Sequence, residues 1–138
     1  YVDVEKQLVG DDFEFAINIA ESVNIDQVRI PSMFVQILVE NAFVHGLKGW
    51  DGHKFIHIGI SKVGKNTCIK VRDNGPGFDI RSVGKKRTGL NVITQTIVIV
   101  NERNKNKMTF SLNNEQENGK NVGCVATIVI PENIKLFI

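Results

Sequence analysis

The sequence is poor in cysteine, in net charge and in long apolar runs. Its two cysteines, Cys68 and Cys124, lie far apart, each inside an apolar segment. Closely spaced partners for a zinc site are absent, so we expect two buried free thiols, as in a reducing compartment. The formal net charge of +2 is too small to indicate a nucleic-acid partner by itself, and no apolar run reaches membrane-spanning length. We therefore expect no direct contact with nucleic acid and no membrane contact by this domain.

The size and composition suit one globular domain with a real core, since 42% of the 138 residues are hydrophobic. At the start of the chain, Tyr1, Val4 and Leu8 recur at helical spacing. We therefore interpret residues 1–10 as the end of an upstream helix, and the chain as part of a longer protein.

Hydrophobic periodicity predicts five strands and two amphipathic helices. Period-two alternation indicates strands at 12–20, 55–61 and 67–73, and a closing hairpin over a polar loop at 113–121. Helical spacing indicates 30–49, with Pro31 at the first position, and 88–103, where Ile97 to Val100 alone would also suit a strand. The order β-α-β-β-α-β-β predicts an α/β (α+β) fold, a two-layer sandwich in which helices cover one face of a mixed, mostly antiparallel sheet.

The stretch "VRDNGPGF", residues 71–78, contains Asn-Gly, which is a strong hairpin signal. However, the strand that ends at Asp73 is already expected to pair with 55–61, and nothing after Gly77 alternates. The turn is therefore predicted to lead into the irregular segment 78–87, and long irregular segments are more often functional than idle.

Two polar residues interrupt the apolar stripe of the first predicted helix. Glu40 and Asn41 stand between "ILV" and "AFV", where they either form a solvated flank or serve a function. The functional interpretation is that Asn41 offers an amide oxygen to a hard cation that shares phosphate oxygens. His45, one turn later, more often packs or hydrogen-bonds than acts as a ligand.

The segment from Asp73 to Thr88 has the composition of a nucleotide site. A carboxylate at a strand end can accept a hydrogen bond from an exocyclic amine, and the glycines after it allow a flat ring to approach the backbone. Basic residues then precede Thr88, a suitable N-cap for a helix whose free N–H groups attract phosphate. A solvated basic loop is the alternative for that stretch.

Three motifs resemble those of the GHKL ATPases, whose nucleotide-binding domain is called the Bergerat fold. "LVENAFVHG" is similar to the family's N box, "DNGPGF" to its G1 box and "RTGLNVI" to its G2 box. Within this superfamily the chain most resembles the LytS-like sensor histidine kinases. The resemblance implies that residues 1–138 form a single ATP-binding catalytic domain that uses ATP and Mg²⁺, with the phosphoacceptor and sensor regions absent.

The resemblance also implies roles for particular residues. Asn41 would coordinate Mg²⁺ on the ATP phosphates, with Glu40 at a commonly acidic position. Asp73 would bind the adenine amino group, in a pocket shaped by Gly75 and Gly77. The residues implied at the phosphates or in the lid above them are His45, Lys48, Lys85, Lys86, Arg87, Thr88, Gly89 and Leu90.

Two positions depart from the patterns of the superfamily. Arg87 replaces a glycine of the usual G2 box, and its side chain would either clash with the loop or supply a cation to the phosphates. A degenerate nucleotide-binding or interaction module, with weak or no ATP binding, is therefore the alternative function. Ile37 takes the place where the ATP-hydrolysing members and the anti-sigma serine kinases carry a glutamate, which disfavours those classes.

The resemblance finally implies partners and a location. The γ-phosphoryl group of ATP would pass to a histidine on an upstream dimerisation domain of a homodimer, and then to a response regulator. His53 and His57 stand at the start and in the interior of a predicted strand rather than in the setting of an acceptor. The domain would be cytoplasmic, in a protein of the inner membrane.

Overall fold

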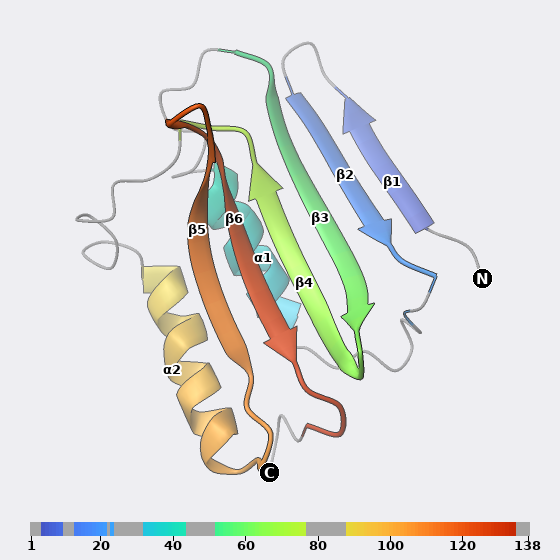
Figure 1. Cartoon of the computed structure of the whole chain (residues 1–138), viewed down its shortest axis with the longest axis vertical. Coiled ribbons are helices and arrows are strands. Elements are labelled where there is room, and N and C mark those ends of the chain that lie inside the picture. The colour runs from blue at the N-terminus through green and yellow to red at the C-terminus, as the bar shows by residue number, and fades with distance from the viewer. Residues whose placement is uncertain are drawn as a thin grey trace.

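Six strands form one sheet in the order β1-β2-β3-β4-β6-β5, and two helices cover one of its faces (Figure 1). This computed structural model describes residues 4–9, 13–21, 23, 32–43, 52–76 and 88–134. The β2–β3 pair is parallel, and the other neighbouring pairs are antiparallel. The predicted two-layer α+β sandwich is thereby confirmed. The elements are β1 Val4–Val9, β2 Phe13–Ile19, α1 Ser32–Asn41, β3 Lys54–Val63, β4 Asn66–Asp73, α2 Thr88–Glu102, β5 Thr109–Glu117 and β6 Lys120–Ile130.

The core lies between the helices and the central strands. Alternate residues of a strand share one face and residues three or four apart share one side of a helix, so each element contributes one apolar row. In this core Phe34, Ile56, Ile69, Ile93 and Ile128 are completely buried. The remaining members of the buried cluster are Leu38, Ala42, Ile58, Val71, Leu90, Ile97, Val100, Met108, Ala126 and Ile130.

Helix α2 keeps a helical conformation through a stretch rich in β-branched residues. Ile93, Ile97 and Val100 are buried on one side, whereas Val98 and Ile99 are about half exposed. Packing of one apolar side against the sheet outweighs the weak helix propensity of valine and isoleucine. The helix predicted over 88–103 is confirmed, and the strand alternative for Ile97 to Val100 is wrong.

The N-terminal segment is a strand rather than the end of a helix. β1 pairs antiparallel with β2, with Leu8 opposite Phe15 and Val4 opposite Ile19. Two residues four apart lie on the same side of a helix and also on the same side of a strand, so that spacing fits both structures. The segment is a strand because its pairing satisfies the backbone groups along the outer edge of β2.

The closing hairpin is tighter than predicted. Instead of a polar loop over 113–121, β5 continues to Glu117, β6 begins at Lys120, and only two residues connect them. Asn118 and Gly119 have φ values of 53° and 80°, and a type I′ turn requires positive φ at both central positions. The Asn-Gly hairpin signal is therefore realised here, while Asn74-Gly75 follows a strand that pairs elsewhere.

Two further expectations concern cysteine and the membrane. Cys68 and Cys124 are both buried thiols, as predicted. Among the described residues, no helix has the length and apolar character needed to cross a membrane. The second half of the helix predicted over 30–49, including its proposed glycine stop, lies outside the described residues.

Candidate functional site

Several chain segments with predicted functions end at the same end of the sheet. β4 ends there at Asp73 and β6 begins there, and the last turn of α1 lies behind them, whereas α2 begins beside β5, nearer the middle of the sheet (Figure 1). Helix α1 ends at Asn41 on this side of the sheet, and α2 begins at Thr88 after the segment that follows β4. Residues distant in sequence thus meet around the carboxyl end of β4.

Asp73 is a buried acid at this strand end, with only 3% of its surface exposed. Its Oδ1 accepts a hydrogen bond of 2.9 Å from the N–H of Gly75, which is also buried. A buried carboxylate is costly unless hydrogen bonds compensate for lost water, and an aspartate that binds the backbone two residues ahead forms a local turn. The "DNG" motif therefore orients its own acid.

The neighbours of Asp73 across the sheet are set by strand register. Asp73 lies opposite Ile56 on β3 and opposite Cys124 on β6, and Cys124 in turn lies opposite Asn114 on β5. Side chains directly opposite each other share a face, and this row shares the face of the core residues Ile58 and Val71. The acid thus stands at the end of the core, on the helix-covered face.

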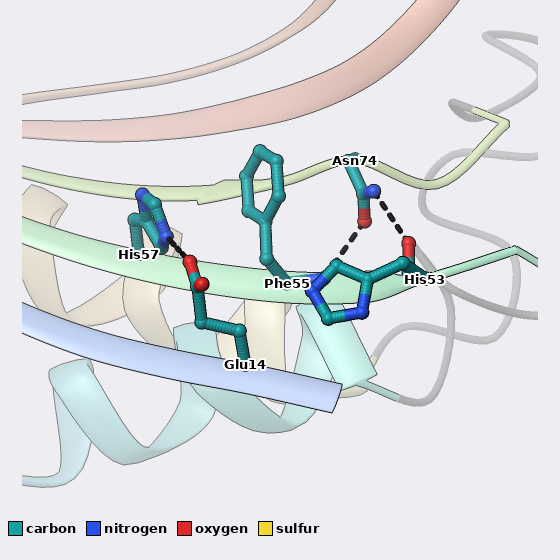
Figure 2. Close-up of polar contacts among 5 residues, drawn as sticks. All are labelled: Glu14, His53, Phe55, His57 and Asn74. Atoms are coloured by element: carbon teal, nitrogen blue, oxygen red, sulfur yellow. Dashed lines mark hydrogen bonds and ion pairs between the residues drawn. The ribbon is translucent and has the colours of Figure 1, made fainter. Parts of the chain in front are cut away.

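Asn74 ties the end of β4 to the start of β3 (Figure 2). Its Oδ1 accepts a hydrogen bond of 2.9 Å from the N–H of Phe55, and its Nδ2 donates one of 2.7 Å to the carbonyl of His53. One amide side chain therefore satisfies two backbone groups where the β3–β4 ladder stops at Asp73. This clamp restrains the residue that follows the buried acid.

Replacing Asn74 by alanine is expected to lower the free energy of unfolding by about 1–3 kcal/mol, because a part-buried backbone N–H loses its partner. Exposed Asn106 is the matched control, and Asn106→Ala should stay within about 0.5 kcal/mol of the parent. Urea unfolding measures both changes. Equal stability of the two variants would contradict the clamp.

The opposite face of the sheet carries two polar side-chain pairs. His57 Nε2 lies 2.6 Å from Glu14 Oε2, and its ring stacks on Phe55 with centroids 4.4 Å apart (Figure 2). Arg72 Nε lies 2.8 Å from Glu115 Oε1. Both pairs are partly exposed and contribute little to stability. As predicted, His53 precedes β3 and His57 lies within it.

Strand β6 contains a bulge beside Asp73. Glu115 lies opposite Gly123 but Gln116 lies opposite Asn121, so Val122 has no partner on β5. Gly123 is buried, and a Cβ atom placed on it would stand 2.2 Å from the carbonyl oxygen of Asp73. Bulges are frequent next to functional sites, where they redirect backbone or side chains.

The predicted site residues have different positions in the structure. Asn41 is half-buried at the end of α1, whereas Glu40 is exposed and accepts a hydrogen bond of 3.3 Å from Gln36. The Leu90 side chain is buried in the core, which leaves its backbone as the group available at the start of α2. Six predicted residues lie outside the described part of the chain: His45, Lys48, Gly77, Lys85, Lys86 and Arg87.

Sequence reasoning missed the residues that hold Asp73 in place. Nothing in the sequence pairs Asn74 with the backbone of Phe55, because that contact depends on where β3 starts. For Gly123 a signal existed, since an isolated glycine inside a strand pattern indicates a bulge or a close backbone approach.

A cavity of about 640 Å³ lies at the end of the sheet opposite Asp73, near Lys65, Lys107 and Pro131. The ammonium of Lys107 already donates to the carbonyls of Asn101 and Asn104. Among the described residues, no cluster of three or more His, Cys, Asp or Glu side chains suits a metal ion.

The chain is similar in sequence to sensor histidine kinases. No family model matches it. Sensor histidine kinase YpdA of Escherichia coli (strain K12) is 38% identical over 79 residues, which are 57% of this chain and 14% of YpdA. Sensor protein LytS of Streptococcus agalactiae serotype V is 29% identical over 85 residues, 62% of this chain and 14% of LytS. The chain thus spans about one seventh of the length of these relatives.

Solved structures match over most of the chain. The mycobacterial sensor histidine kinase MprB has a TM-score of 0.60 at 15% identity, over 90% of this chain and 85% of that chain. The catalytic domain of histidine kinase ThkA has a TM-score of 0.58 at 15% identity, over 90% and 81%. This chain has the fold of a histidine kinase catalytic domain. Its relatives in sequence include sensor histidine kinases and sensor protein LytS, which agrees with the resemblance of the three motifs.

Proposed function

We propose that this chain is the ATP-binding catalytic domain of a two-component sensor histidine kinase. The observation that supports this most is the buried carboxylate of Asp73 at the end of β4, held by the N–H of Gly75. It stands on the helix-covered face, at the end of the sheet where α1 also ends. The fold and the relatives point to the same function.

In this proposal Asp73 accepts a hydrogen bond from the amino group of adenine. Gly75 has no side chain to obstruct the base, and Gly77 has the same role in the following turn. The phosphates extend toward the N-terminus of α2, where Thr88, Gly89 and Leu90 supply backbone N–H groups of the kind that attract phosphate. Lys85, Lys86 and Arg87 add positive charge to a lid over the phosphates.

Asn41 suits Mg²⁺, because its amide oxygen is a ligand that this hard cation accepts and it stands at the end of α1. Mg²⁺ usually keeps several waters and shares phosphate oxygens, so one protein ligand is enough. When bound, the ion neutralises phosphate charge during transfer. In the proposal His45 and Lys48 face the phosphates or support the lid, and Glu40 occupies a commonly acidic position.

The chain's own contribution to the reaction is position and charge, which is most of what phosphoryl transfer requires from a protein. The acceptor is a histidine on the dimerisation domain of the same homodimeric protein, and a neutral imidazole is already a good nucleophile. A response regulator then takes the phosphoryl group. We propose a cytoplasmic location for this domain in a membrane-bound sensor.

Calorimetric titration with a non-hydrolysable ATP analogue and Mg²⁺ tests the proposal. We expect a dissociation constant between micromolar and millimolar and weaker binding of the corresponding purine riboside triphosphate, which lacks the amino group. Absence of binding at millimolar analogue would reject the ATP-site proposal in favour of an interaction module.

The chain alone should not phosphorylate itself, because none of its three histidines has the sequence setting of a phosphoacceptor. Incubation with radiolabelled ATP should leave no acid-labile label on the chain. Label that appears on His57 or His53 would contradict this assignment, whereas free phosphate released by the chain alone would favour an ATPase.

A further inference from the structure

We propose that the bulge of β6, with Gly123 facing Asp73, is a positioning device for the adenine-binding carboxylate. This inference rests on the proposed ATP site, because it concerns the acid that reads the base. It makes Gly123 a positioning residue rather than a residue that contacts nucleotide. Selectivity for a 6-amino purine therefore depends on a glycine of β6. This strand is the neighbour of β4 in the sheet, although β5 lies between them along the chain.

The backbone contact is very close. A Cβ atom on Gly123 would lie 2.2 Å from the Asp73 carbonyl oxygen and 3.3 Å from the Cα of Asn74. Carbon–oxygen contacts of this kind normally lie at about 3.3 Å or more. Any side chain at this position therefore forces Asp73 and β6 apart by roughly 1 Å, and the atom that must move is backbone.

Asp73 is restrained from two sides. On the β3 side, Asn74 binds the N–H of Phe55 and the carbonyl of His53. On the β6 side, the ladder ends at the pair of Asp73 and Cys124, and the next residue of β6 is Gly123. With the first restraint intact, a displacement imposed at Gly123 cannot be relieved by moving the whole strand end away from β6.

The bulge creates the close approach. Gly123 has a φ of 159°, and Val122 before it, which has no partner on β5, is 42% exposed. The extra residue changes the direction of β6 just where β4 stops. The close approach of Gly123 thereby restrains the backbone of Asp73 on its β6 side, just where the β4–β6 ladder ends.

The matched pair for testing is Gly123→Ala and Gly59→Ala. Both glycines lie in strands of the same sheet, but a Cβ on Gly59 meets nothing within 4 Å. We expect Gly123→Ala to weaken binding of the Mg²⁺ complex of the ATP analogue roughly tenfold or more, and Gly59→Ala to change it less than about twofold. The decisive quantity is selectivity, the ratio of affinities for the ATP analogue and purine riboside triphosphate. Gly123→Ala should bring this ratio close to one.

A double-mutant cycle separates positioning from general damage. If Gly123 acts through Asp73, then Gly123→Ala should have little further effect on selectivity in an Asp73→Asn background. An unchanged selectivity ratio in folded Gly123→Ala would overturn the inference. An equal loss of selectivity from Gly123→Ala in the parent and in the Asp73→Asn background would overturn it as well.

A second variant keeps the test decisive if Gly123→Ala does not fold. Deletion of Val122 leaves the pairs of Gly123 with Glu115 and of Asn121 with Gln116 next to each other, which restores a regular ladder. We expect this variant to fold and to lose selectivity, and retained selectivity would reject the inference. Different results would reject the proposed function itself: no binding of nucleotide by the parent chain, or binding by Asp73→Asn as tight as that of the parent.

Discussion

Asp73→Asn is expected to weaken binding of the ATP analogue roughly 10- to 150-fold. This range follows from the net contribution of a hydrogen bond to a charged group, about 1.5–3 kcal/mol, at about 1.4 kcal/mol for each factor of ten. Isothermal titration calorimetry of parent and variant in the same Mg²⁺ buffer measures it. The loss should appear in affinity for the base rather than in the number of sites.

Asparagine is the suitable replacement because it keeps the local turn. Its Oδ1 can still accept the hydrogen bond from the N–H of Gly75, whereas alanine would leave that buried donor without a partner. The matched control is Glu132→Gln, the same carboxylate-to-amide change at an exposed position after the far end of β6. This control should bind as the parent does.

The choice of base gives the same variant a second readout. Inosine triphosphate presents a carbonyl oxygen where ATP presents its amino group, and an oxygen facing a carboxylate is repelled. Because an asparagine amide can donate as well as accept, Asp73→Asn should lose much of the parent's preference for ATP over inosine triphosphate. A variant that retains both the parent's affinity and its preference would show that Asp73 does not contact the base.

The sequence predicted the central elements because their periodicity is strong. In β3 Ile56 and Ile58 are buried at alternate positions, as are Ile69 and Val71 in β4. Helix α2 buries Ile93 and Ile97 one turn apart, although its β-branched stretch alone also suited a strand. The segment of β1 was misread since Val4 and Leu8 satisfy the helical and the strand period alike. Only a partner strand distinguishes the two, and pairing is a tertiary property.

In the candidate site too, local contacts could be predicted from the sequence and long-range contacts could not. Asp73 and Gly75 were found from sequence because their hydrogen bond is local, spanning two residues. By contrast, Asn74 acts on the start of β3, and Gly123 acts on Asp73 through the register of β6. Such contacts join residues far apart in the chain, so local propensity and periodicity carry little information about them.

Phe34→Ala should produce the largest loss of stability, about 3–5 kcal/mol, through the transfer free energy of the ring and the cavity that it leaves. Phe34 is completely buried, on the side of α1 that packs into the core. For a domain of this size the loss corresponds to a fall in Tm of roughly 10–20 °C, which thermal unfolding by circular dichroism measures directly.

Met33 provides the control within the same helix, since it precedes Phe34 and is 50% exposed. Met33→Ala should remain within about 0.5 kcal/mol of the parent. Comparable losses in the two variants would mean that α1 does not pack through the side that carries Phe34.

Added nucleotide provides a further check. A ligand that binds only the folded state raises the free energy of unfolding by about 2.7 kcal/mol when it is present at one hundred times its Kd. Phe34 lies in the first turn of α1, whereas Asn41 ends the helix. Saturating nucleotide should therefore raise the stability of Phe34→Ala and of the parent by similar amounts, and a much smaller increment in the variant would indicate that the core holds the site in shape.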